Sequence, residues 1–280
     1  MTSSTDEISI TLVVDNRAAE GLAVEHGFSA WIEAGDFRIL FDTGQGMALP
    51  INAHNLGIEP ASAHAVVLSH GHYDHTGGLS DILVTSRNIK VFSHPDIVLS
   101  RTSIRQGQAR SIGMPDKSKE ALERAANRWH HVHALALLAP TIGLTGPIAR
   151  YTAYEDTGGP FYLDTNGSTV DPILDDMGLW LKTRHGLVVM TGCGHAGIVN
   201  TVRQAIDQSG ETRIHAVIGG FHLGEANEER LDRTVEALQA WSPDLVVPCH
   251  CTGEAAVARL SDMPGDRVVV GHAGMKLDMT

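Results

Sequence analysis

The chain has 280 residues, of which 42% are hydrophobic, and its formal net charge is -12. This length suits one large domain or two small ones with a sizeable core. The acidic balance disfavours nonspecific binding to nucleic acid or to anionic membranes. The three cysteines, Cys193, Cys249 and Cys251, do not form a disulfide framework and fit a reducing cytosol. Residues 1–7 lack the pattern of a signal peptide, and the longest apolar stretch, 134–139, is too short to cross a bilayer, so we expect a cytoplasmic protein.

The first third of the chain alternates predicted strands and turns. Runs of apolar and β-branched residues indicate the strands, and Gly57 ends a short helix between them. In chain order we expect strands at 8–14, 28–33 and 37–41, a helix at 47–56, and strands at 65–68 and 89–92.

Residues from about 93 to 139 interrupt this pattern. Residues 117–133 are predicted to be helical, and the stretch before them is polar and contains glycine. A structureless loop of that length would be unusual in a compact domain, so part of it is expected to fold locally. We interpret the segment as an insertion or lid over the site, within a single domain that spans residues 1–280.

The second half repeats the alternation of strands and helices. In chain order we expect a hairpin at 178–183 and 186–191, a helix at 198–207, a strand at 214–218, a helix at 228–241, a strand at 245–247, a helix from Glu254 and a strand at 268–270. Two such halves favour an α/β fold in which two sheets pack together with helices outside.

Four potential metal ligands lie within six residues of one another. They are His70, His72, Asp74 and His75. Neutral imidazole is a favoured ligand of zinc and similar metals, and carboxylate is its usual harder companion. A buried strand precedes the cluster, which places it at the carboxyl end of that strand, where loop side chains converge in layered α/β folds. The spacing therefore predicts a metal site.

Three later strands also end in loops that carry histidine, at His195, His222 and His250. Each follows an apolar run and a small residue, an arrangement that brings distant residues to one rim. A lone histidine of this type is usually structural and hydrogen-bonded to a carbonyl. Their recurrence beside the first cluster favours a metal-binding role for His195 and His250, while His222 stays open between a catalytic acid and a structural residue.

Several nearby polar residues are less informative. Cys249 and Cys251 flank His250 with one residue between them, whereas zinc motifs use two or more, so we interpret both as packing residues. Glu25 and His26 are interpreted as loop residues. The pair at 175–176 is expected either to cap the following hairpin or to face the pocket.

The sequence resembles the metallo-β-lactamase superfamily over nearly its whole length. The resemblance lies in the His70-x-His72-x-Asp74-His75 motif before Gly77-Gly78, in the turn at 42–44, and in the strand that delivers His250. It implies a four-layer αββα sandwich with one or two divalent metal ions at the sheet edge. Zn²⁺ is the expected metal, with Fe or Mn as alternatives.

A narrower resemblance is to the dihydropterin ribofuranosylaminobenzene phosphate synthase-like branch of that superfamily. The stretches that carry it are 25–29, 69–78, 175–176, 191–200 and 219–222.

The resemblance also implies how the ligands are shared. By position, His70, His72 and His195 would hold one metal, and Asp74, His75 and His250 the other. Cys193 stands where the superfamily usually has a bridging aspartate, and it would either bridge as a thiolate or lie buried under the site. Asp42 is the expected partner that fixes a ligand tautomer.

The expected mechanism follows from such a site. A metal lowers the pKa of bound water from about 16 to about 7, which makes hydroxide available to attack a carbonyl or phosphoryl centre. Asp74 would ligate and orient the nucleophile, and His222 is a candidate acid or electrostatic partner near the rim. We therefore expect a metal-dependent hydrolase of a small ester, lactone, amide or phosphate ester. The alternatives are a synthase or lyase acting on a pterin- or phosphoribosyl-containing metabolite, and a non-catalytic metal- or ligand-binding protein. The sequence leaves open whether the protein forms a homodimer.

Overall fold

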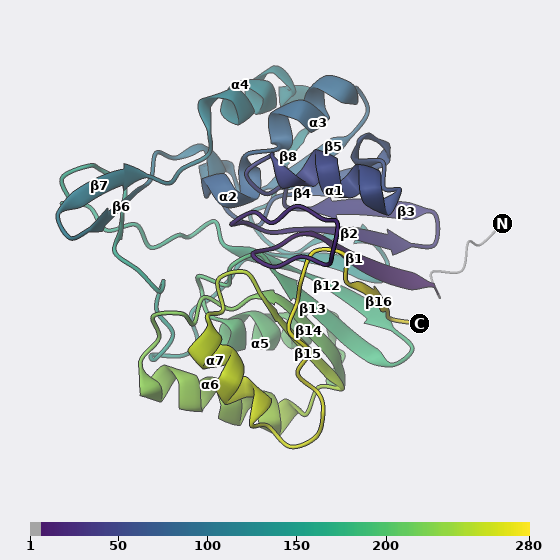
Figure 1. Ribbon diagram of the computed structural model, residues 1–280, viewed down its shortest axis with the longest axis vertical. Helices are drawn as coiled ribbons and strands as arrows, with labels where there is room; N and C mark the ends of the chain where they lie inside the picture. The colour runs from purple at the N-terminus through teal and green to yellow at the C-terminus, as the bar shows by residue number, and fades with distance from the viewer. Residues whose placement is uncertain (1–6) are drawn as a thin grey trace.

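The computed structural model describes residues 7–280, so most of the N-terminal stretch that lacks a signal-peptide pattern lies outside the described residues. Two sheets pack face to face (Figure 1). The first has the order β16-β1-β2-β3-β4-β5-β8 and the second β15-β14-β13-β12-β10-β9. The first sheet consists of β1 (Ile8–Val14), β2 (Ser29–Ala34), β3 (Phe37–Phe41), β4 (Ala65–Val67), β5 (Lys90–Ser93), β8 (Trp129–His131) and β16 (Lys276–Asp278). The second consists of β9 (Ala136–Ala139), β10 (Ile142–Pro147), β12 (Met177–Thr183), β13 (Gly186–Thr191), β14 (Ile214–Gly220) and β15 (Leu245–Cys249).

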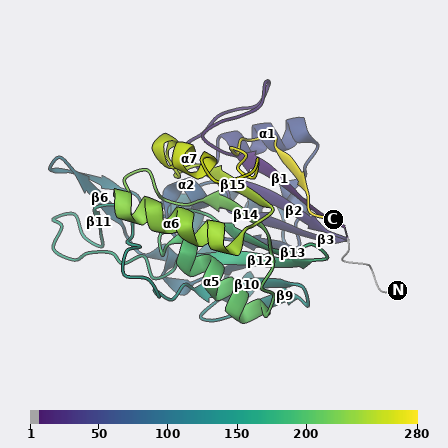
Figure 2. The ribbon, with the colours of Figure 1, turned by 90° about the horizontal axis from the view of Figure 1, so that it is seen from below.

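Helices cover the outer face of each sheet, which completes the predicted four-layer αββα sandwich. The first sheet is covered by α1 (Ala48–Leu56), α3 (Leu79–Thr85) and α4 (Asp116–Arg124), and the second by α5 (Ile198–Ser209), α6 (Glu228–Trp241) and α7 (Glu254–Ser261). Figure 2 shows α5 and α6 lying across the second sheet. None of the helices in the described part of the chain is both long and apolar enough to cross a membrane.

Side-chain alternation along the strands explains why two sheets form. In β2, Ala30 and Ile32 belong to the core between the sheets, while Trp31 points to the helical layer. In β13, Val188 and Met190 face the other sheet, and Val189 packs under the helices. Because successive side chains of a strand point to opposite faces, a strand that is apolar throughout must be covered on both sides.

Strand direction decides where the functional residues gather. β3 and β4 run parallel, as do β13, β14 and β15, so their carboxyl ends meet at one edge. β1 is antiparallel to β2, which is antiparallel to β3, so β1 also ends at that edge. The short helix α2 (Tyr73–Thr76) lies there, on the side away from the two chain ends (Figure 1).

The segment predicted as an insertion is divided among several layers. A small third sheet is built from β6 (Thr102–Arg105), β7 (Gln108–Ser111) and β11 (Phe161–Tyr162), and its β6–β7 hairpin projects from the body beside α2 (Figure 1). The rest belongs to the sandwich itself, because α4 covers the first sheet while β8 and β9 are edge strands.

Two sequence predictions of elements were wrong. The helix expected at 117–133 ends at Arg124, and Trp129 begins β8, where its indole N–H donates to the Ser93 hydroxyl over 2.8 Å. Pairing with β5 therefore overrides the local helical pattern. At 268–270 the structure has only an isolated bridge from Val268 to Val246, and the last strand is β16.

Candidate metal centre

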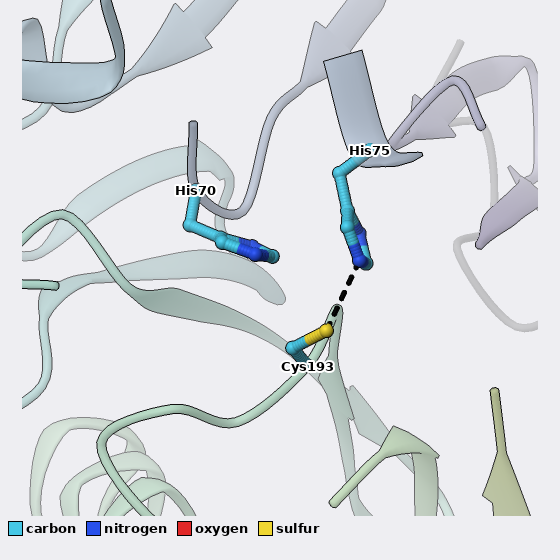
Figure 3. Close-up of side chains that lie close together, drawn as sticks. All are labelled: His70, His75 and Cys193. Atoms are coloured by element: carbon cyan, nitrogen blue, oxygen red, sulfur yellow. Dashed lines mark hydrogen bonds between the residues drawn. The ribbon is translucent and has the colours of Figure 1, made fainter. Parts of the chain in front are cut away.

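The loop after β4 and helix α2 bring the first cluster of predicted ligands to the sheet edge. His70 comes from this loop, His75 lies in α2, and Cys193 follows β13 of the other sheet. The three side chains point toward one another (Figure 3), and the Sγ atom of Cys193 lies 3.1 Å from Nε2 of His75. All three residues are buried, so the two sheets meet here through polar side chains with almost no access to water.

The residues predicted for the first metal lie together. Nitrogen atoms of His70, His72 and His195 are all within 4.8 Å of one another. Nδ1 of His72 and Nε2 of His195 are 3.2 Å apart. Nε2 of His70 is buried and has no hydrogen-bond partner among the described residues.

The residues predicted for the second metal are equally close. Nε2 of His250 lies 3.3 Å from Nε2 of His75 and 3.3 Å from Oδ2 of Asp74, and the last two atoms are 4.0 Å apart. A tetrahedral ion with bonds of about 2.1 Å separates its ligands by roughly 3.4 Å. The spacing of both sets therefore fits a divalent ion such as zinc.

Cys193 lies between the two sets. Its sulfur groups with His70 and His75, with His195 and His222, and with His250 and Cys251, within 4.8 Å in each case. This position agrees with a bridging thiolate, which stays a prediction. The preceding Gly192 has no space for a side chain, since a Cβ atom there would be 2.1 Å from Oγ of Ser69. The close approach of the two loops thus requires glycine at 192.

Hydrogen bonds to surrounding residues turn the imidazole lone pairs inward. Nδ1 of His75 lies 2.7 Å from Oδ2 of Asp42, Nδ1 of His195 lies 2.9 Å from the Thr157 carbonyl, and Nδ1 of His250 lies 2.8 Å from Oδ1 of Asn16. Each oxygen accepts a hydrogen bond from the Nδ1–H group, so Nε2 is the ring atom left to bind a metal. His70 completes the pattern, with Nδ1 3.0 Å from the Ser69 hydroxyl.

Asp42 orders two of these ligands, in the role predicted for it. Its carboxylate is fully buried and accepts from the backbone N–H and the hydroxyl of Ser69, each over 2.7 Å, as well as from His75. The Ser69 hydroxyl, having donated to Asp42, is left to accept from His70. Asp42 has a φ of 59°, a left-handed conformation that Asp tolerates better than most residues.

Electrostatics differ between the two sets of predicted ligands. Burial lowers the pKa of His70, His72 and His195 well below the ordinary value, so these imidazoles are neutral. Burial alone would raise the pKa of Asp74, but the neighbouring His75 and the hydrogen bonds from other imidazoles hold it well below its usual range. Burial opposes protonation of His75, yet Asp42 and Asp74 raise its pKa to about 9. Two buried carboxylates thus attract positive charge to this point, which a metal cation would supply.

A buried ion-pair network supports the histidine loop from behind. The Arg101 guanidinium pairs with Asp175 over 2.6 Å and with Asp171 over 2.8 Å. Asp175 also accepts from the backbone N–H of Gly71, in the middle of the ligand loop. Asp176 accepts from the backbone N–H of Ala196 over 2.7 Å, beside His195. The sequence analysis left the roles of Asp175 and Asp176 open. Both accept hydrogen bonds from the backbone of the loops that carry the predicted ligands, and neither lines the pocket.

The site opens into a pocket of about 370 Å³. Asp74 and Cys193 lie on its wall together with two residues that the sequence analysis assigned elsewhere, His26 and Cys251. His26 lies in a loop, as expected, and its Nε2 atom is 3.1 Å from Oδ2 of Asp74. The sulfur of Cys251, expected to be a packing residue, lies within 4.8 Å of ligand atoms of Cys193 and His250.

His222 stands on the same wall, at the end of β14. Nε2 of His222 lies 3.2 Å from the Gly158 carbonyl, which accepts a hydrogen bond from it. Nδ1 of His222 has no hydrogen-bond partner among the described residues. Its ring centroid is 4.1 Å from that of His195. The loop that carries Gly158 is fixed by an ion pair between Asp156 and the buried Arg230 over 2.6 Å. No sequence motif indicated this loop.

Comparison with known proteins agrees with this geometry. The model of the Metallo-beta-lactamase superfamily matches residues 22–201. A 7,8-dihydropterin-6-methyl-4-(beta-D-ribofuranosyl)-aminobenzene-5'-phosphate synthase of Methanocaldococcus jannaschii is 35% identical over 241 residues, which cover 82% of this chain and 81% of that protein. An uncharacterized protein of the same archaeon is 34% identical over 268 residues, which cover 95% and 98%. The crystal structure of Tm1679, a metal-dependent hydrolase of the beta-lactamase superfamily, aligns with a TM-score of 0.82 at 30% identity, over 98% of this chain and 99% of that one.

The chain therefore belongs to the metallo-β-lactamase superfamily. The narrower resemblance to the dihydropterin ribofuranosylaminobenzene phosphate synthase-like branch is confirmed by the archaeal relative. The fold predicted from the sequence, a four-layer αββα sandwich of this superfamily, is confirmed too.

Proposed function

We propose that this protein is a metal-dependent hydrolase that binds one or two divalent metal ions, with zinc as the expected metal, and acts on a small ester, lactone, amide or phosphate ester. One observation carries the proposal. Four buried imidazoles have their Nδ1 atoms hydrogen-bonded away from the site, so that their Nε2 lone pairs converge beside a carboxylate and a thiol. A structural cluster would satisfy every buried ring nitrogen, whereas Nε2 of His70 and Nε2 of His72 have no hydrogen-bond partner among the described residues.

The chain's own residues have distinct roles in this proposal. His70, His72 and His195 would hold one ion, and Asp74, His75 and His250 the other, with Cys193 between them. A bound divalent metal supplies Lewis acidity and lowers the pKa of water that it binds. Asp74 lines the pocket and would orient the attacking group. His222 would take a proton from the attacking water at Nδ1 and pass it to the leaving group, because its Nε2–H group donates to the Gly158 carbonyl.

Two features support hydrolysis of a small substrate. The pocket of about 370 Å³ admits a metabolite-sized molecule, and its wall includes the proposed ligands. The similar structure of Tm1679 is described as that of a metal-dependent hydrolase.

A second candidate is a synthase or lyase that uses the metals as Lewis acids without net hydrolysis. It is favoured by the archaeal relative, which is named as a synthase and is 35% identical. Both reactions would use the same residues, so the substrate decides between them.

The test is metal-dependent turnover. Protein stripped of metal with a chelator is assayed before and after addition of Zn²⁺, Fe²⁺ or Mn²⁺ on p-nitrophenyl phosphodiester, lactone, β-lactam and carboxylester substrates. The hydrolase proposal expects turnover of one substrate class that is lost on stripping and restored by metal. If the metal-loaded protein hydrolyses none of them but binds a pterin or a phosphoribosyl compound, the synthase reading replaces it.

A further inference from the structure

The β6–β7 hairpin brings two arginines to the pocket of a strongly acidic protein. Arg105 ends β6 and Arg110 lies in β7, and both line the pocket opened by the metal-ligand residues. The hairpin projects beside α2 at the site edge (Figure 1), and β11 joins it to the body through pairing of Phe161 with Ser103. The net charge of the chain is -12, so two cations at the mouth of one pocket are an exception to its general charge.

Both arginines are available to a ligand. The Arg110 guanidinium is exposed and lies 5.4 Å from the centroid of the Tyr73 ring, and it makes no ion pair with any residue in the described part of the chain. Arg105 pairs with Glu225, but the two side chains are 51% and 54% exposed. An exposed pair of this kind contributes little, so a substrate anion can replace Glu225.

Arg101 differs from the two hairpin arginines. It lies near the base of the same hairpin, but it is buried and already neutralised by Asp171 and Asp175. Structural arginines in this region are thus paired inside the protein, whereas the two on the hairpin face the pocket. A guanidinium matches the two oxygens of a carboxylate or phosphate and stacks on aromatic faces.

The pocket is lined by residues of two chemical kinds. His72, Asp74 and Cys193 are proposed metal ligands and are called the metal end here, and the two arginines come from the hairpin. Phe161 and Ile112 also line it and supply an apolar surface. We propose that the hairpin is the substrate-anion site, which binds a terminal phosphate or carboxylate of a substrate whose apolar or aromatic part rests on Phe161 and whose reacting bond lies at the metal end. Only the placement of the reacting bond at the metal end rests on the proposed function.

Binding of simple anions tests the site directly. Phenylphosphonate and benzoate are titrated calorimetrically into the zinc-loaded protein, with benzyl alcohol as the neutral probe. Loss of one charge-assisted contact weakens binding by about 10- to 100-fold, so we expect R110Q to weaken phenylphosphonate binding in that range and R105Q to do so less. The preferred probe distinguishes phosphate from carboxylate recognition.

The matched control is R124Q, which removes an exposed arginine of α4 that pairs with Glu120 in its own helix. It is expected to bind phenylphosphonate as the wild type does, and wild-type binding should weaken as NaCl rises, more steeply than binding by R110Q. Unchanged affinity in both R110Q and R105Q would overturn the proposal, because the anion would then bind at the metals alone. An equal loss in R124Q would also overturn it.

Kinetics give a second readout. For mono-4-nitrophenyl glutarate and 4-nitrophenyl valerate, an anionic and a neutral ester of similar size, R110Q should raise the KM of the anionic ester relative to that of the neutral one. An unchanged ratio contradicts the anion site while leaving the hydrolase proposal intact. Absence of turnover contradicts the hydrolase proposal, and the calorimetric comparison still decides the anion site.

Discussion

Replacement of Asp42 by asparagine is expected to weaken metal binding although Asp42 touches no metal. The carboxylate accepts three hydrogen bonds of 2.7 Å, two from Ser69 and one from His75. An asparagine keeps the acceptor for the Ser69 N–H but places an NH₂ group where Oδ2 was. That NH₂ group would face the Nδ1–H group of His75 and the hydroxyl hydrogen of Ser69. Three hydrogen-bond donors would then lie together without an acceptor between them.

The structure sets the size of the effect. His75 can relieve the clash only by moving its proton to Nε2, the atom that faces Cys193 and His250. Loss of such an orienting partner typically lowers metal affinity 10- to 100-fold, or about 1.4–2.8 kcal/mol. Asparagine tolerates the φ of 59° at this position, so the backbone itself should not be strained.

The assay is competition for zinc between the protein and a chromophoric chelator of known affinity. D42N is compared with wild type and with D36N, an equally conservative change at an exposed turn residue. Circular dichroism confirms that each variant is folded. A zinc dissociation constant of folded D42N within twofold of the wild-type value would refute the reasoning, and so would an equal loss in D36N.

Three further changes test the rest of the site. H72A should abolish metal-dependent turnover, since His72 belongs to the first ligand set; activity equal to wild type at saturating zinc contradicts that assignment. C193S should reduce occupancy of one metal, measured by elemental analysis, and two fully occupied sites would rule out the thiolate bridge. R101M leaves Asp171 and Asp175 buried without a partner, so the free energy of unfolding in urea should fall by about 3–5 kcal/mol, whereas R124M, at an exposed ion pair, should change it by less than about 1 kcal/mol.

The sequence by itself determined the local features. The motif from His70 to His75 concentrates ligands within six residues, so no distant contact is needed to recognise it. The predicted bounds of strands β1 and β3 and of helix α6 agree with the structure. Such signals depend on neighbouring residues and are readable from one sequence.

Tertiary structure alone decided that Cys251, Asn16 and the β6–β7 hairpin reach the centre. Parallel pairing sets Thr191 beside Gly219 and Gly219 beside Pro248, so that the residues just beyond these positions emerge side by side. That register brings Cys251 to the pocket, and the end of β1 brings Asn16 to His250. The β6–β7 hairpin reaches the pocket through its pairing with β11, about 50 residues further along the chain. These contacts depend on strand order and register across the whole sandwich, for which a local pattern carries no signal.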